Sequence, residues 1–267
     1  MINLVVRIYR YLFARAVFVK WNKLLYRLSL CGLGVLNYEN PRVSGELYFL
    51  KKVALQQKSK STIIDVGANN GDYSLMCLNL FKNVNIYSFE PHPKTFISLM
   101  SVLSGKNVSC FNMAVSKKSG ILDLFDYDSD DGSEHASLYQ DVIEKIHYKK
   151  SVSHRVKAVA LDDFIRDKEI CEIDLLKIDT EGHELEVLKG ARFAIKNRII
   201  RVIHFEFNEM NVVSRSFFKD FVELLPGYDL FRLLPAGLIP LKYSPLNTEI
   251  FAYQNIVAFL RGGHRVI

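Results

Sequence analysis

The segment at residues 63–71 constrains the fold most, because an apolar run there passes directly into a turn that holds two glycines. Such a run is typical of a buried strand, and a glycine turn of this kind joins a strand to a helix. A second apolar run at 84–89 ends at Glu90. In a parallel sheet the two run ends lie at one edge, where Asp65 and Glu90 would face the same ligand. The pattern therefore predicts a site for a ligand that contains a nucleoside.

The spacing of the turn excludes two common nucleotide-binding loops. A P-loop needs two glycines five positions apart, followed directly by a lysine. Here Gly67 and Gly71 are four positions apart and no lysine follows in the loop. The dinucleotide fingerprint lacks its middle glycine, because Asn69 stands there. The turn N–H groups suit an amino-acid carboxylate, Asp65 an ammonium, and Glu90 two ribose hydroxyls. S-adenosylmethionine carries all three groups, and a tight turn without a ligand is the alternative.

Apolar runs and helical patterns alternate through the chain, which predicts an α/β fold with a doubly wound, mostly parallel sheet. The expected strands lie at 62–66, 85–89, 108–115, 121–127, 174–179 and 201–207. The expected helices lie at about 47–57, 71–81, 93–103, 183–196 and 215–225, with a short helix that begins at 161. We expect irregular structure from 128 to 153, and antiparallel strands at 228–234 and 256–260 that close the sheet.

The excess positive charge lies at the N-terminus. Residues 1–38 contain six of the 35 lysines and arginines and no acid, whereas the other 29 basic residues balance the 29 acids. The net charge of +6 therefore belongs to an N-terminal arm, which we place at 1–45, and the domain at 46–267 is neutral. A neutral domain without a broad basic face does not favour a nucleic-acid partner.

The arm is too broken by charges to be a spanning helix or a signal peptide, because no apolar run approaches the roughly 20 residues that spanning requires. Its apolar and basic residues instead fall on opposite sides of two short helices, whose phase changes near residue 17. A basic amphipathic helix with an aromatic residue such as Trp21 can lie on an anionic membrane surface. The alternative is a helical cap on the domain or on a second subunit of a homo-oligomer.

The four cysteines are far apart in the sequence and form no Cys-x-x-Cys pair, which argues against a zinc site and a disulfide scaffold. Unpaired cysteines of this kind are typical of a reducing compartment. We therefore expect a cytoplasmic protein, with peripheral contact at the inner face of the membrane through residues 1–36.

Several motifs occur in the order found in FkbM-type methyltransferases, which the chain resembles over about residues 60–210. They are Asp-Val-Gly-Ala-Asn-Asn-Gly at 65–71, Phe-Glu-Pro at 89–91, Leu-Asp-Asp at 161–163, the charged run at 174–184 and Leu-Lys-Gly-Ala at 188–191. The resemblance implies a class I, Rossmann-like fold that uses S-adenosylmethionine, and mostly O-methylation, often of glycans. His183 departs from the smaller or aromatic residue that is usual in the family, so we assign it no special role.

The predicted cofactor contacts come from four parts of the chain. They are Asp65, Gly67, Ala68, Asn69, Gly71, Glu90, Pro91, Ala114, Val115 and Ser137. The resemblance implies that Ala114 and Val115 pass near the adenine, and that Ser137 borders the cofactor or the acceptor, with a surface loop as the alternative. His135 and the acids at 130–131 suggest a metal site, but their spacing fits no firm ligand template. We therefore predict that no metal is required.

Charged residues interrupt two apolar strands near their ends. Lys177, Asp179 and Glu181 alternate along one strand, and His204 and Glu206 alternate along the next. Charges in central strands are costly unless they are paired, so their presence indicates a site. A general base that takes the proton of a weak hydroxyl nucleophile raises the rate by about 10²–10⁴. The candidates for the base are Asp179, Glu206 and His204, and the alternative is a structural ion pair between Lys177 and Glu206.

These observations predict an S-adenosylmethionine-dependent O-methyltransferase that acts on a hydroxyl of a sugar or of a lipid-linked glycan. One alternative is an NAD-dependent oxidoreductase on a similar sheet. Another is a non-catalytic scaffold that keeps the cofactor pocket. Methylation of RNA is a weaker alternative, because the domain carries no excess of positive charge.

Overall fold

A computed structural model describes residues 2–57, 60–129 and 132–262 of the chain. Its centre is an eight-stranded sheet with the order β10-β9-β11-β8-β7-β1-β2-β3. The strands are β1 (Ser61–Val66), β2 (Val84–Phe89), β3 (Val108–Phe111), β7 (Leu175–Ile178), β8 (Val202–Phe207), β9 (Tyr228–Leu234), β10 (Gly237–Pro240) and β11 (Gln254–Leu260). Strands β3, β2, β1, β7 and β8 are parallel, and β11 pairs antiparallel with both β8 and β9. This confirms the predicted fold class.

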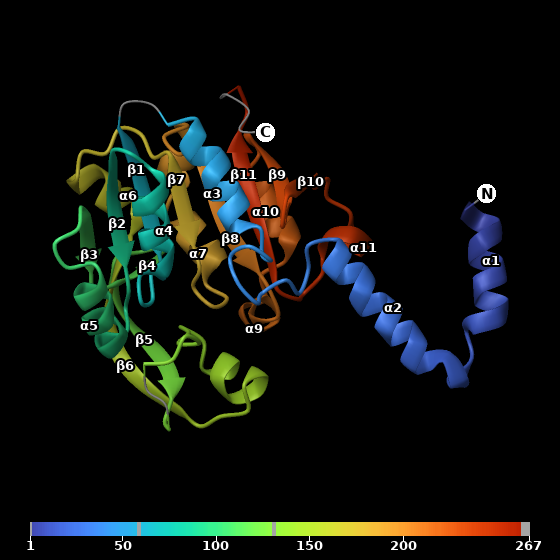
Figure 1. Cartoon of the computed structure of the whole chain (residues 1–267). Coiled ribbons are helices and arrows are strands. Elements are labelled where there is room, and N and C mark those ends of the chain that lie inside the picture. The colour runs from blue at the N-terminus through green and yellow to red at the C-terminus, as the bar shows by residue number, and fades with distance from the viewer. Residues whose placement is uncertain (1, 58–59, 130–131, 263–267) are drawn as a thin grey trace.

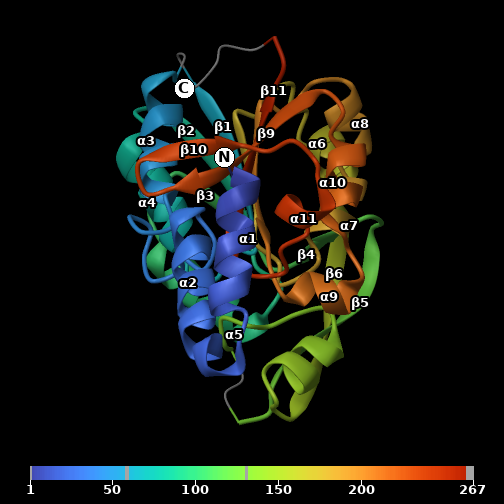
Figure 2. The ribbon, with the colours of Figure 1, turned by 90° about the vertical axis from the view of Figure 1, so that its right-hand side faces the viewer.

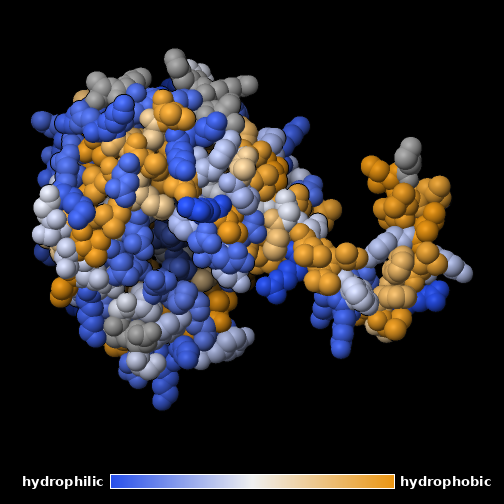
Figure 3. Space-filling view, in the orientation of Figure 1, coloured by the Kyte–Doolittle hydropathy of each residue, from blue (hydrophilic) through white to orange (hydrophobic). Residues whose placement is uncertain are grey.

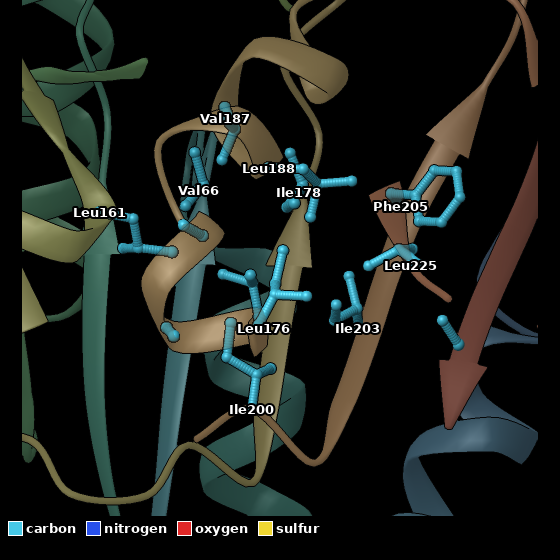
Figure 4. Close-up of a cluster of buried hydrophobic side chains, with 14 of the residues drawn as sticks. Val66, Leu161, Leu176, Ile178, Val187, Leu188, Ile200, Ile203, Phe205 and Leu225 are labelled. Carbon is cyan, nitrogen blue, oxygen red and sulfur yellow. The ribbon is translucent and has the colours of Figure 1, made fainter. Parts of the chain in front are cut away.

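Helices cover both faces of the sheet, as a doubly wound fold requires (Figure 1). One face carries α3 (Glu46–Leu55), α4 (Asp72–Leu80) and α5 (Pro93–Val102), and the other carries α6 (Leu161–Asp167), α7 (Glu184–Lys189), α8 (Arg192–Lys196) and α10 (Phe218–Leu224). Successive strand residues point to opposite faces, so Ile63 packs toward α3 and α4 while Ile64 and Val66 join the other core. Figure 4 shows that second core, in which Leu176, Ile178 and Ile203 belong to strands.

A second, three-stranded sheet lies beyond the carboxyl ends of the parallel strands (Figure 1). Its order is β4 (Ala114–Ser116), β6 (Ser151–Ala160) and β5 (Gly120–Tyr127). The prediction of one strand at 108–115 is wrong, because β3 ends at Phe111 and the chain re-enters a different sheet at Ala114. Strand β6 was not predicted, since its run of polar residues hides an alternation in which only every second side chain near its end is buried.

Two further predictions differ from the structure, and two short elements were not predicted. The helix predicted at 183–196 is divided into α7 and α8, with Gly190 and Ala191 between them. Gly190 lies so close to β4 that a Cβ there would be 2.1 Å from the backbone oxygen of Ser116. The helix predicted at 215–225 is wrong at its start, because α9 (Met210–Ser214) ends at Arg215, whose φ is +55°, and α10 begins only at residue 218. Strand β10 and the short helix α11 (Pro245–Thr248) were not predicted.

The N-terminal arm forms the two expected helices, α1 (Ile2–Phe13) and α2 (Val19–Gly32), joined through a short 3₁₀ turn. Figure 1 shows both standing away from the body, and Figure 2 shows them from the side on which they project. The chain meets the body at Val35, which is fully buried and pairs with Gln254 of β11. None of the helices in the described ranges is both long and apolar enough to cross a bilayer.

Candidate functional site

A cavity of about 650 Å³ opens at the carboxyl ends of β1, β2, β7 and β8, and the small sheet forms part of its wall. Figure 3 shows the hollow in the face of the body. Most of the predicted site residues line it: Asp65, Gly67, Ala68, Asn69, Glu90, Pro91, Ala114, Val115, Asp179 and Glu206. Three predicted residues, Gly71, Ser137 and His204, do not line it. The topology therefore brings together the ends of four strands that are far apart in the sequence.

Asp65 lies at the end of β1 and is almost fully buried. One carboxylate oxygen accepts a 2.7 Å hydrogen bond from the Ser74 hydroxyl of α4. Burial is the main cause that raises the pKa of Asp65, to about 6, and the Ser74 hydrogen bond opposes it. The turn that follows needs Gly67, which has a φ of +80° and lies so close to Asp179 that a Cβ would be 1.6 Å from its backbone oxygen. This close approach places the Asp65 and Asp179 strand ends against each other.

The turn after β1 differs from the expected anion cradle. The backbone N–H groups of Gly67 and Ala68 both donate to the carbonyl of Phe89, at 3.0 and 2.9 Å. The N–H of Asn69 donates to a carboxylate oxygen of Glu90 at 3.0 Å. These three donors are therefore satisfied inside the protein, and they fix the turn to the end of β2. The prediction that they receive an amino-acid carboxylate is wrong for these three groups in this conformation.

Glu90 follows β2 and is held by backbone donors on both of its carboxylate oxygens. One oxygen accepts from the N–H of Asn69, and the other accepts from the N–H of His92 at 2.7 Å. Burial raises the pKa of Glu90 to about 7, against the effect of these two hydrogen bonds. Each carboxylate oxygen has two lone pairs, so both can accept a further hydrogen bond from a ligand hydroxyl. Glu90 is thus fixed in place and still able to bind.

A buried lysine occupies the centre of the β7 and β8 end of the cavity. The Nζ atom of Lys177 lies 3.4 Å from Asp179, 3.7 Å from Glu46 and 3.9 Å from Glu206. The ion pair with Glu206 that the sequence left open is therefore present. Burial lowers the pKa of Lys177, but Asp179, Glu206 and Glu46 outweigh it and hold that pKa above its ordinary value. Lys177 stays charged and keeps the carboxylates around it together.

The carboxyl groups around Lys177 are crowded and poorly hydrogen-bonded. Burial raises the pKa of Glu46, Glu181 and Glu206, and the neighbouring carboxylate of Asp179 raises each of them further. Within the described residues, the Nζ atom of Lys177 and one carboxylate oxygen of Glu181 are buried without a hydrogen bond. Buried polar atoms without partners are uncommon in folded proteins. This end of the cavity is therefore suited to a polar ligand that supplies the missing hydrogen bonds.

His204 is fully buried and lies behind the cavity wall. Its Nδ1 is 2.9 Å from the hydroxyl of Tyr73, and its Nε2 is 2.8 Å from the side-chain oxygen of Asn255. Burial, with the positive charge of Lys177, holds the pKa of His204 well below its usual range. Both ring nitrogens are thus engaged and the ring stays neutral. The geometry gives His204 a structural place instead of the predicted role as general base.

Ser137 and Gly71 support the cavity from outside its lining. The buried hydroxyl of Ser137 donates a 2.8 Å hydrogen bond to the backbone oxygen of Glu181, which ties the small sheet to the end of β7. Gly71 has a φ of +91°, and a Cβ there would lie 2.9 Å from the side chain of Leu99. Its conformation lets the turn enter α4. Neither residue is placed for the direct cofactor contact that the sequence predicted.

Other residues of the charged run at 174–184 have structural partners. A carboxylate oxygen of Glu184 accepts hydrogen bonds from the backbone N–H groups of Thr180 and Gly182, both at 3.0 Å. This fixes the loop that carries Glu181. The Nε2 of His183 is 2.9 Å from the hydroxyl of Ser116, and burial lowers the pKa of His183 to about 4. His183 therefore joins β4 to α7 as a neutral ring.

Sequence reasoning missed the cavity residues that come from the arm, from α3 and from the C-terminal tail. They are Leu36, Tyr38, Pro41, Glu46 and Tyr253. A buried Lys177 signals that carboxylate partners exist, but no motif locates Glu46 at the first turn of α3. His135 does line the cavity, with its ring stacked on His147 at 4.5 Å between centroids. Asp130 and Asp131 lie outside the described residues, so the absence of a required metal stays a prediction.

Comparison with known proteins decides the family. The FkbM methyltransferase domain matches residues 65–230. The chain belongs to the FkbM methyltransferase family. Membership confirms the predicted family, the methyltransferase class and S-adenosylmethionine as the cofactor, and it leaves no support for the NAD-dependent alternative.

Two curated proteins are similar to this chain at low identity. The hexuronic acid methyltransferase AglP of Haloferax volcanii is 27% identical over 164 residues, which cover 60% of this chain and 63% of AglP. The 2-O-methyltransferase NoeI of Sinorhizobium fredii is 24% identical over 201 residues, which cover 70% of this chain and 79% of NoeI. A solved precorrin-6y C5,15-methyltransferase from Geobacter metallireducens has a TM-score of 0.44 and 12% identity, over 80% of this chain and 86% of that one.

The β1 and β2 end of the cavity fits the cofactor of the FkbM family in its chemistry. Asp65 offers a buried carboxylate for an ammonium group, and Glu90 offers two oxygens for ribose hydroxyls. Ala114 and Val115 of β4 give this end an apolar wall that suits a flat base. That these particular residues bind the cofactor is a proposal.

Proposed function

We propose that this chain transfers a methyl group from S-adenosylmethionine to a hydroxyl of a sugar, either free or carried by a lipid. The observation that carries the proposal is the division of one cavity into two ends. One end has carboxylates suited to the cofactor, and the other has the Lys177 cluster with Asp179 half-exposed. The names of the relatives AglP and NoeI, which refer to a hexuronic acid and to 2-O-methylation, support a sugar hydroxyl as the acceptor.

The cofactor supplies, when bound, a methyl group that is already activated on a sulfonium sulfur. The chain's contribution is then mainly alignment, which is worth roughly 7–11 kcal/mol for a well-oriented pair of reactants. Glu90 fixes the ribose and Asp65 fixes the ammonium. The hydrogen bond from Ser137 to the backbone of Glu181 ties the small sheet, which forms part of the cavity wall, to the end of β7. The acceptor is held between these groups and the Lys177 cluster.

Asp179 is the group that we assign as general base. Its side chain is 34% exposed, whereas that of Glu206 is 9% exposed and that of Lys177 is 3% exposed. The Nζ atom of Lys177 lies 3.4 Å from a carboxylate oxygen of Asp179. Asp179 would take the proton of the acceptor hydroxyl, while the cofactor held by Asp65 and Glu90 would supply the activated methyl group. Glu206 is also paired with Lys177, and it positions that lysine beside Asp179.

The charges at this end also favour an acceptor without an acid group. Glu46, Asp179, Glu181 and Glu206 face a single described cationic neighbour, Lys177, so the cluster carries excess negative charge whenever two or more of these carboxyl groups are ionised. A carboxylate brought within about 8 Å of an excess negative charge meets a repulsion on the order of 2 kcal/mol at an effective dielectric constant of about 20. We therefore expect a neutral sugar to be preferred over a hexuronic acid, by at least about tenfold in kcat/KM.

The test supplies the full chain and S-adenosylmethionine with matched pairs of neutral and hexuronic glycosides. Mass spectrometry then finds which acceptor gains one methyl group, and mild alkali separates an alkali-stable ether from a methyl ester. The proposal expects an ether on the neutral sugar. Methylation of the uronic carboxyl, or cofactor binding without transfer to any glycoside in the panel, would contradict it, and the second outcome would favour the scaffold alternative.

A further inference from the structure

The N-terminal arm presents an apolar surface that nothing in the described structure covers. Helix α1 has no buried residue, and α2 has only Leu30. Large apolar side chains are exposed along both helices: Ile2, Leu4, Val5, Val6, Ile8, Tyr9, Tyr11, Leu12, Phe13, Val19, Trp21, Leu24, Leu25, Tyr26 and Leu28. Figure 3 shows this side of the arm as the main apolar projection from an otherwise mixed surface. Contiguous exposed apolar surface of this extent marks an interaction site.

The apolar and basic residues of the arm are separated by helical geometry. At 100° per residue, Asn3, Arg7 and Arg10 form one narrow polar stripe along α1, and the apolar residues occupy the rest of its surface. Along α2, Lys20, Lys23 and Arg27 form a stripe opposite Trp21, Leu25 and Leu28. This separation is typical of helices that lie in the plane of an interface.

Contacts within the arm hold the two helices together without covering these faces. The side-chain amide of Asn22 in α2 donates to the backbone oxygen of Phe13, and the Tyr9 hydroxyl donates to the side-chain oxygen of Asn22. Phe13 and Phe18 pack edge to face at the turn between the helices, with 5.2 Å between their ring centroids. The arm is thus two helices joined by contacts near their turn, and their apolar faces remain exposed.

The charge of the arm selects its partner. Residues 1–38 carry six basic side chains and no acid, so a second copy of the arm would bring six more positive charges to the same contact. The rest of the chain has no net charge that would attract the arm. An anionic lipid surface offers both of the things that the arm lacks, an apolar phase and negative charge. We propose that the arm binds the protein peripherally to an anionic membrane, with Trp21 and its apolar neighbours in the lipid.

The attachment of the arm links this membrane contact to the cavity. After α2 the chain enters the body through Leu36, whose N–H donates to the backbone oxygen of Tyr253 at 2.8 Å. Leu36 and Tyr38 then line the cavity, and the rings of Tyr38 and Tyr253 pack edge to face at 5.9 Å. Membrane binding would therefore hold the cavity wall next to the arm close to the lipid headgroups. The arm proposal itself does not depend on which acceptor is methylated.

The experiment mixes the full chain with vesicles of phosphatidylcholine alone or with one third phosphatidylglycerol, and measures binding by co-sedimentation. Trp21 is the only tryptophan in the sequence, so its fluorescence reports the arm directly. The proposal expects binding to the anionic vesicles, a blue shift of the Trp21 emission, and loss of both at high salt. No binding to anionic vesicles at low salt, or equal binding to both vesicle types, would overturn it.

Two matched variants separate the arm from general charge. The first, Lys20→Glu with Lys23→Glu and Arg27→Glu, should weaken vesicle binding by at least about 100-fold, since each lost cation costs roughly fivefold. The second places three reversals on exposed lysines of the body, Lys82→Glu, Lys118→Glu and Lys196→Glu, and should bind within a few fold of the parent protein. Equal losses in the two variants would contradict the arm proposal. If the parent protein formed a dimer without lipid, and only the first variant were monomeric, the arm would instead be assigned to self-association.

Discussion

The two ends of the cavity are built in different ways. At the ends of β1 and β2, the carboxylates of Asp65 and Glu90 each accept short hydrogen bonds from Ser74 or from backbone N–H groups. At the ends of β7 and β8, Lys177 is surrounded by carboxylates at 3.4–3.9 Å and donates no hydrogen bond to a described residue. The first end is rigid before any ligand arrives. The second holds charge whose hydrogen bonds are still to be made.

This difference indicates a division of labour. A site for a ligand that is the same in every turnover benefits from carboxylates that are already fixed. A site where a proton moves benefits from carboxyl groups whose proton affinity is tuned by burial and by neighbouring charges, as it is for Glu206 and Glu181. We therefore expect substitutions at the first end to change cofactor affinity, and substitutions at the second end to change turnover.

The largest effect is expected for Asp179→Asn. The amide cannot accept the acceptor's proton, so kcat should fall by about 10²–10⁴ while the affinity for S-adenosylhomocysteine stays within a few fold. Steady-state kinetics and calorimetric titration measure the two quantities separately. Asp167→Asn, an exposed carboxylate on α6, serves as the matched control and should leave both unchanged. If Asp179→Asn turned over at the parent rate, Asp179 could not be the base.

A smaller effect is expected for Glu90→Ala, and it should fall on cofactor affinity and not on turnover. Loss of the carboxylate leaves two ribose hydroxyls without their acceptors, which should weaken S-adenosylhomocysteine binding by about 1–3 kcal/mol, or roughly 5- to 150-fold. At saturating cofactor, kcat should stay within a few fold of the parent value. Glu223→Ala, an exposed residue of α10, provides the control in the same titration. A large fall in kcat with unchanged cofactor affinity would erase the distinction between the two ends.

The smallest effect is a dependence of cofactor affinity on pH. Burial raises the pKa of Glu90 to about 7, so below that pH the carboxyl group holds a proton and has one oxygen fewer with which to accept hydroxyls. Affinity for S-adenosylhomocysteine should therefore fall as the pH drops through 7, by up to about tenfold between pH 8 and pH 6, and level off above pH 8. Glu90→Gln cannot titrate and should flatten this part of the profile. A profile identical in the two proteins would place the titrating group elsewhere.

The first end of the site could be predicted from the sequence, because its elements are local. An apolar run, a glycine turn and an acid are adjacent in the chain at Asp65, and an apolar run followed by an acid recurs at Glu90. Asp179 and Glu206 were found for the same reason. Glu46 and Tyr38 could not be found, because they reach the cavity only through the packing of α3 and of the segment after the arm. The fold prediction failed at β6, whose polar alternation suits the small sheet and resembles a surface loop in the sequence.

The roles of His204 and Ser137 could not be predicted from the sequence, for a further reason. Polar residues near strand ends are candidates both for a site and for its support, and only the direction of the side chain separates the two. His204 shares the face of Lys177, yet its ring nitrogens bond to Tyr73 and Asn255 behind the cavity. Ser137 lies between cavity residues, yet its hydroxyl bonds to the backbone of the neighbouring loop.

The most direct test of the two-ended cavity is a crystal structure of the full chain grown with S-adenosylhomocysteine. The account predicts that both ribose hydroxyls lie within hydrogen-bond distance of the Glu90 carboxylate, and that the sulfur faces the space in front of Asp179. A ligand bound in the reverse direction, with its ribose at Lys177, or a ligand bound outside this cavity would contradict the account.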